Sequence, residues 1–325
     1  MSERFAPKLS DADLKRLDRV GRRRGRNRPA KVPARLARTS AFAAKRRGLI
    51  TDSKFERMYY VPGHSVVRVS GRELGTQHRD ALYAVFRLPC RRVSVGAPPQ
   101  WLMIVDTTWR ELLMAMGLTQ HVNNIAGLHY AFKDIKQVVI SVYEGKEDQI
   151  LAAYRDGKLP RDQGRMGNLL HDIEWSGLGL DDRVRISYGD WTAQMVASAK
   201  LVSLNADVQF ALKSDYAKSF WPYIDGLSQH TWVDEEMLAH LVGRDLWGPA
   251  ETSVTRGEFR KLCRKAFDDM VRSGGLISWR VEVRGVGRKK SHRYHHVHAL
   301  RQGGEQMELP MLSEVVSEKA KAVCL

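Results

Sequence analysis

A long amphipathic helix near the C-terminal end is the pattern that most constrains the fold of this chain. Between Phe259 and Val271, apolar residues follow one another at alternating intervals of three and one. This spacing places them on one face of a helix that packs against a core. Thr255 and Glu258 match a capping box, which predicts the first turn of the helix. The glycine pair at 274–275 predicts its end.

A β-hairpin is predicted directly after this helix. Residues 277–284 alternate apolar and polar side chains, residues 285–292 form a basic turn, and residues 293–300 return as the partner strand. A basic helix followed by a basic hairpin is the layout of a winged helix, in which the helix enters the major groove and the hairpin contacts the flanking backbone. The predicted DNA contacts on these two elements are Arg256, Arg260, Lys261, Arg264, Lys265, Arg288, Lys289, Lys290 and Arg293.

An earlier part of the chain predicts a similar order of elements. Residues 107–116 and 119–136 carry apolar residues at helical spacing, and Gly117 separates them, which favours a helix-turn-helix. The other predictions for this part are strands at 66–69, 138–143, 169–175 and 183–188, a helix at 76–86, a loop or short strand at 90–99, a short apolar run at 101–105 and a long polar loop at 145–167.

The second helix of this earlier helix-turn-helix carries little charge. Its candidates for DNA contact are Gln120, Asn123, Asn124 and Lys133. Amide side chains can pair with adenine in the major groove. The same residue types are also ordinary on a solvated surface, and an alternative is that this half contacts another protomer.

Three more elements are predicted between the two helix-turn-helix segments. Residues 208–212 are expected to form a short strand, and Ser214 to begin a helix that runs to about Leu227. Asp234 can cap a short helix that ends near Val242.

Positive charge is concentrated in the first 47 residues. They hold sixteen Lys or Arg against four acids, a net +12 of the +16 carried by the whole chain. Such an excess points to a polyanion, most often nucleic acid or an anionic membrane surface. A basic arm can follow phosphates or enter a minor groove; the alternative is a solvated tail. The arginines expected to make these contacts are Arg22, Arg23, Arg24, Arg26 and Arg28.

Several functional classes find no pattern in the sequence. No apolar run reaches the roughly 18 residues of a spanning helix and no signal-type segment is present, so the expected location is the cytoplasm. The three cysteines form no CxxC pair, and no phosphate-binding GxxxxGK[ST] loop occurs. We therefore expect no metal, no nucleotide and no other cofactor.

One enzymatic alternative remains open. His296-Val-His298 matches the metal-binding pattern of rolling-circle nickases, in which a tyrosine attacks the phosphodiester. No tyrosine follows His298, and the pair Tyr59-Tyr60 would serve only in a permuted fold. The expectation is that these histidines pack on or beside the hairpin and that the protein is not an enzyme.

Six short motifs occur in a distinctive order: Ala37-Arg-Thr-Ser-Ala-Phe42, Val69-Ser-Gly-Arg-Glu-Leu74, Thr108-Trp-Arg-Glu-Leu112, Met116-Gly-Leu118, Leu169-Leu-His-Asp-Ile173 and Val184-Arg-Ile-Ser187. In this order they resemble the tandem winged-helix replication initiators of plasmids, of the TrfA and RepA type. The resemblance covers about residues 35–240 and continues by layout to about 300. The basic arm and the segment 145–167 are not clearly matched.

The resemblance implies a protein that binds repeated sites (iterons) in the double-stranded DNA of an origin, helps to open the adjacent AT-rich duplex and recruits host replication proteins. It implies no covalent chemistry. It also implies that the protein forms dimers, which dissociate and bind DNA as monomers. The host sliding clamp, replicative helicase and host initiator are the implied protein partners. The alternative is a winged-helix transcriptional regulator, which would share every physical feature of an initiator but would neither open an origin nor contact the clamp.

The last segment resembles a short clamp-binding peptide. Gln306-Met-Glu-Leu-Pro-Met311 would place Gln306 at a polar rim and Met307 and Leu309 in an apolar pocket. The prediction for the whole chain is an α+β fold of two tandem winged-helix domains. Its expected parts are a basic arm at 1–47, a first domain at 48–200, a second domain at 201–302 and a flexible tail at 303–325.

Overall fold

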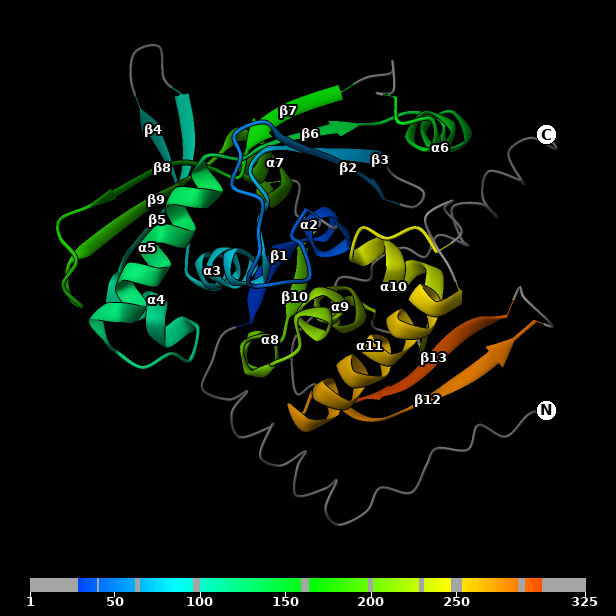
Figure 1. Ribbon diagram of the computed structural model, residues 1–325. Helices are drawn as coiled ribbons and strands as arrows, with labels where there is room; N and C mark the ends of the chain where they lie inside the picture. Colours follow the sequence, from blue (N-terminus) through cyan, green and yellow to red (C-terminus); the bar gives the residue numbers. More distant parts are fainter. Residues whose placement is uncertain are drawn as a thin grey trace, which may run out of the picture.

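The computed structural model describes residues 29–39, 41–61, 65–95, 100–158, 164–197, 201–227, 231–246, 253–285 and 290–299. Helices and antiparallel sheets alternate around a continuous hydrophobic core (Figure 1). All strand pairs in the named sheets are antiparallel, in keeping with the predicted α+β class.

The C-terminal unit contains the predicted amphipathic helix and hairpin. Its sheet has the order β11-β13-β12, so the short strand before the helices lies against the return strand of the hairpin. Its elements are α9 (Asp215–Gly226), β11 (Trp232–Asp234), α10 (Glu235–Leu241), α11 (Ser253–Arg272), β12 (Leu276–Arg284) and β13 (Ser291–His298).

The N-terminal unit contains the same order of helix, strand, helix, helix, strand and strand, with β4 (Arg91–Val95) inserted after the first helix and β6 (Val139–Tyr143), α6 (Glu147–Arg155) and β7 (Gly164–Asn168) inserted before the last two strands. Its sheet has the order β4-β5-β9-β8, in which the last three strands correspond to β11-β13-β12 and β4 is added at the edge. Its elements are α3 (Thr76–Arg87), β5 (Gln100–Thr108), α4 (Trp109–Ala115), α5 (Val122–Lys136), β8 (Leu170–Trp175) and β9 (Arg183–Tyr188).

The expectation of a long loop at 145–167 is wrong. Helix α6 (Glu147–Arg155) and strand β7 (Gly164–Asn168) occupy much of it. Ile150, Leu151 and Tyr154 are spaced for one helix face and pack over a small core on the neighbouring sheet. That sheet has the order β2-β3-β6-β7, with β2 (Phe55–Val61), β3 (Ser65–Gly71) and β6 (Val139–Tyr143).

The end of the predicted basic arm belongs to the folded body. Strand β1 (Ala30–Pro33) pairs with β10 (Leu201–Leu204), and α2 (Ala34–Arg38) follows it. The expectation of an arm up to residue 47 is wrong here because Ala30, Val32 and Leu36 are buried. The prediction of an arm rests on the excess of charge, and it does not weigh these few apolar side chains against that excess.

Two smaller predictions also fail. Residues 208–212 lie mostly in α8 (Ala206–Ala211) rather than in a strand, since Asn205 caps a helix through the backbone N–H of Val208. Thr255 does not begin α11, because the helix already includes Ser253, and the Glu258 carboxylate pairs with Lys261 instead of the backbone. Helix α7 (Asp190–Ala197) was not predicted.

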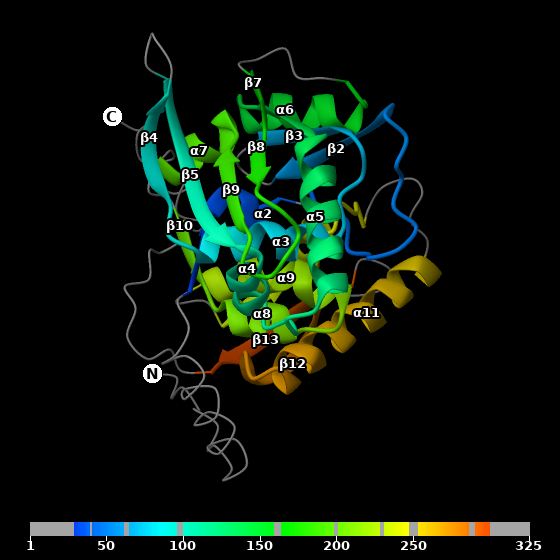
Figure 2. The ribbon, with the colours of Figure 1, turned by 90° about the vertical axis from the view of Figure 1, so that its left-hand side faces the viewer.

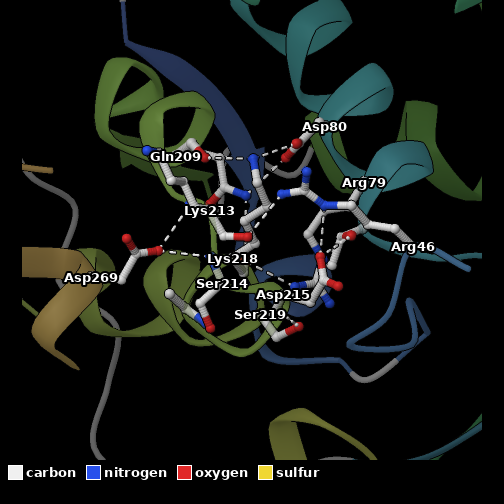
Figure 3. A network of polar contacts seen from close by, with 12 residues as sticks. Arg46, Arg79, Asp80, Gln209, Lys213, Ser214, Asp215, Lys218, Ser219 and Asp269 are labelled. Atoms are coloured by element: carbon white, nitrogen blue, oxygen red, sulfur yellow. Dashed lines mark hydrogen bonds and ion pairs between the residues drawn. The ribbon is translucent and has the colours of Figure 1, made fainter. Parts of the chain in front are cut away.

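The two units meet at a buried polar network between α3 of one and α8 and α9 of the other (Figure 3). The Lys218 ammonium donates to Asp80 Oδ2 at 2.5 Å and to the Gln209 carbonyl at 3.0 Å. The Arg79 guanidinium is 2% exposed and donates to the carbonyls of Lys218 and Phe42 at 2.9 and 3.1 Å. Burial lowers the pKa of Arg79. Each unit therefore supplies hydrogen-bond acceptors for a buried cation of the other: Asp80 for Lys218, and the Lys218 carbonyl for Arg79.

Figure 1 shows α5 at the left of the molecule and α11 at the lower right. In Figure 2, where the molecule is turned by 90°, α5 stands near the middle and α11 extends to the right. The β12–β13 hairpin extends beside α11.

Candidate nucleic-acid interface

Helix α11 divides into a buried face and a basic outward face. Phe259, Cys263 and Phe267 are fully buried and face the core. Lys261, Arg264 and Lys265 are exposed, as the alternating intervals of three and one between the apolar residues predict. The Lys261 ammonium contacts the Glu258 carboxylate at 2.7 Å, an exposed pair that a phosphate could replace.

Arg260, a predicted DNA contact, links the hairpin to the helices. Its Nε and Nη2 donate to the two carboxylate oxygens of Glu235 at 2.7 and 3.0 Å, and Nη2 also donates to the Lys290 carbonyl at 2.8 Å. The Glu235 side chain is 2% exposed and accepts a third bond from the backbone N–H of His292 at 2.8 Å. The hydrogen bond that Arg260 donates to the Glu235 carboxylate raises the pKa of Arg260. One carboxylate therefore joins α10, α11 and β13.

Arg293 lies on the outer face of the β11-β13-β12 sheet. Its guanidinium is 3.5 Å from the centroid of the Trp232 ring and donates to both carboxylate oxygens of Asp234 at 2.8 and 3.1 Å. Arg256 is half-buried and contacts the Leu246 carbonyl at 3.5 Å. Lys290 is exposed and directly precedes β13.

The N-terminal unit presents a different surface. Thr108 caps α4 by accepting from the Glu111 N–H, and Gly117 has the positive φ that ends a helix. Asn123 and Lys133 are exposed on α5, as predicted. Val122 and Tyr130 are 61% and 63% exposed on the same helix. The helical spacing predicted Val122 on the apolar face, which is wrong because it lies in the first turn and is exposed, and Tyr130 was not predicted as a surface residue.

Two other residues predicted on this surface hydrogen-bond within the protein. The Asn124 amide donates to the carbonyl and the hydroxyl of Thr119 at 2.8 and 3.0 Å. Gln120 accepts from Arg110, which also forms a forked pair with Asp181 at 2.7 and 2.8 Å. The turn between β8 and β9 is thus held by an acidic residue, in contrast to the basic turn predicted after β12.

The remaining predicted contacts lie outside the described residues. They are the arm residues Arg22, Arg23, Arg24, Arg26 and Arg28, the hairpin residues Arg288 and Lys289, and the clamp-motif residues Gln306, Met307 and Leu309. Within the folded end of the predicted arm, Arg46 is paired with Asp215 at 2.9 Å.

The histidines of the nickase pattern, His296 and His298, lie on the face of β13 that packs against the helices. His296 is 1% exposed, and the His298 ring contacts the Ile224 carbonyl at 3.0 Å. On the same strand His292 is 7% exposed, and Tyr294 stacks on Phe267 with ring centroids 5.1 Å apart. Burial, together with Arg260, lowers the pKa of His292. No group of three or more potential metal ligands occurs among the described residues. Tyr59 and Tyr60 are also buried.

No helix in the described part of the chain is both long and apolar enough to span a membrane. Comparisons by sequence found no matching protein-family model and no matching curated protein. Comparison with solved structures found similar chains. Domains 2 and 3 of RctB share 9% identity with a TM-score of 0.51, covering 83% of this chain and 99% of that one.

A second structure of RctB domains 2–3 has 10% identity and a TM-score of 0.46, covering 79% of this chain and 95% of that one. The Pi initiator protein in complex with iteron DNA has 12% identity and a TM-score of 0.46, covering 69% of this chain and 90% of that one. The fold of the chain is thus similar to that of RctB domains 2 and 3.

Proposed function

We propose that the protein is a replication initiator that binds repeated sites in double-stranded origin DNA through two tandem winged helices. The observation that carries the proposal is the repeated topology. Each unit has two consecutive helices and a later hairpin whose return strand pairs with the strand before those helices. In the C-terminal unit the hairpin follows the helices directly, and in the N-terminal unit β6, α6 and β7 are inserted between them. In the C-terminal unit the second helix presents Lys261, Arg264 and Lys265 outward.

The charges of this surface suit a duplex. Arginine can meet guanine O6 and N7 together, and lysine contacts phosphates. The brace of Arg260 and Glu235 fixes the hairpin relative to α11, so that both can contact DNA at once. The shared fold with RctB domains 2 and 3 and the motif order described above support the initiator class.

Several parts of the proposal depend on the resemblance to plasmid initiators. They are the opening of an AT-rich tract, the recruitment of host replication proteins, and the exchange between dimer and monomer. We also propose that binding is non-covalent and that the protein cleaves no phosphodiester bond. Sequence-specific reading is assigned to α11, with phosphate contacts from the hairpin and from the basic N-terminal residues.

Selection from a randomised pool of duplexes tests the proposal. The expected result is enrichment of one motif, present as direct repeats beside an AT-rich tract near the gene. Affinity should fall steeply with salt, with a slope of roughly −0.9 per neutralised phosphate. Enrichment of a single promoter palindrome would instead indicate a transcriptional regulator, and the absence of any enriched duplex would refute DNA recognition.

A further inference from the structure

Two glycines stand inside helices where no feature of the free protein requires them. Among the helices of the described residues, only α5 and α11 contain a glycine away from their ends: Gly127 and Gly257. These are the second helices of the two helix pairs. Each glycine lies in the second turn of its helix, the sixth residue from Val122 and the fifth from Ser253.

Packing does not explain either glycine. A Cβ built at Gly127 or at Gly257 would meet nothing within 4 Å. Neither has a positive φ, so neither supplies a conformation that other residues avoid. Gly275 is different, because a Cβ there would lie 2.6 Å from the Trp221 ring. An interior glycine weakens a helix relative to alanine because it loses more backbone entropy on folding.

Gly127 is exposed, and Gly257 is half-buried with open space where a Cβ would stand. Gly257 lies one turn before Lys261 and two turns before Arg264 on the basic face of α11. Gly127 lies one turn after Asn123 and three residues before Tyr130 on the exposed side of α5. A helix without a side chain at such a point lets a ligand approach its backbone.

We propose that Gly127 and Gly257 are the points at which the two helices come closest to the DNA, and that α5 contacts the duplex as α11 does. This inference rests on the proposed function. The early turns of such a helix meet the base edges in the major groove, which is where both glycines lie. DNA is favoured over a protein partner because cations flank Gly257, and because Asn123, an amide that can pair with a base, lies one turn before Gly127.

The test combines stability and binding in the full-length protein. The variants are G127A, G127L, G257A and G257L, and A152L on the exposed side of α6 is the matched control. Thermal midpoints are measured by circular dichroism. Affinity is measured by fluorescence anisotropy with the duplex that the unaltered protein enriches from a randomised pool.

Each alanine variant should melt higher, by about 2 °C, because helix propensity rises. Each should also bind the duplex more weakly, by at least about threefold, and each leucine variant by more than about tenfold, because the added atoms hold the helix away from the bases. A152L should bind as the unaltered protein does. A variant that is more stable but binds DNA more weakly indicates a contact point, because a merely structural glycine would not change the two quantities in opposite directions.

Three results would overturn the inference. Alanine and leucine variants that bind within twofold of the unaltered protein would show that no close approach occurs. If G127L kept its DNA affinity but changed the molar mass measured by light scattering, α5 would face a second copy of the chain instead. If the unaltered protein enriched no duplex, the proposed function itself would be refuted, and the glycine variants would not be needed to show it.

Discussion

Replacing Glu235 by glutamine should loosen the hairpin from the helices and destabilise the protein. The carboxylate accepts three hydrogen bonds, two from Arg260 and one from the backbone N–H of His292. Glutamine has the same shape but only one acceptor oxygen. Whichever way its amide is placed, its NH2 group faces at least one of these donors, so at least one bond is lost and two donors oppose each other.

The expected cost follows from burial. The Glu235 side chain is 2% exposed, so water cannot replace the missing acceptor. A lost charge-assisted hydrogen bond of this kind costs about 2 kcal/mol of unfolding free energy. For a chain of this size that corresponds to a fall of about 3 °C in the thermal midpoint.

Urea unfolding followed by circular dichroism measures this change. E258Q is the matched control, because Glu258 is also paired with a cation of α11 but is exposed. We expect E258Q to unfold at the midpoint of the unaltered protein. If E235Q did the same, the three-way brace would contribute nothing and the argument from its geometry would be refuted.

Three further predictions concern charge, pH and chemistry. The triple variant K261E/R264E/K265E should bind the duplex at least about a hundredfold more weakly. The dependence of its affinity on salt should correspond to roughly three fewer neutralised phosphates. Equal affinity in an anisotropy titration would exclude α11 as the helix that reads the bases. Burial lowers the pKa of His78, His240 and His292. Because the unfolded chain then binds more protons, stability should be full above about pH 6.5 and fall as the pH drops below it. Urea midpoints between pH 5 and 8 measure this, and H240F should reduce the slope; a midpoint that rises on acidification would contradict the assignment. Supercoiled origin DNA incubated with the protein and Mg²⁺ or Mn²⁺ should acquire no covalently attached protein at a 5′ end, as seen on denaturing gels; attachment would restore the nickase alternative.

Much of the C-terminal unit was predictable because its signals are local. The apolar stripe of α11, the positive φ of Gly274 and the alternation along β12 each report the structure of their own segment. The same holds for Thr108 as the cap of α4 and for the turn at Gly117.

The failures came where the structure depends on distant partners. Strand β1 exists because β10 pairs with it across about 170 residues of sequence, which a short basic segment does not announce. Helix α6 needs the sheet surface at Tyr60 and Val66 to bury Ile150. For the candidate interface, the sequence predicts which residues are charged but not which are already paired: Arg260 is bonded to Glu235 and Arg293 to Asp234, while their contact with DNA stays a prediction.

The junction of Asp80, Lys218 and Arg79 has a consequence for the sites that the protein would select. Rotating one unit against the other would strip these charges of their acceptors in a place that water does not reach. The angle between α5 and α11 is therefore fixed before any duplex arrives. A spacer lengthened by about five base pairs, half a helical turn, would turn one of the two groove segments away. The protein should then tolerate base changes inside a repeat better than changes in repeat length.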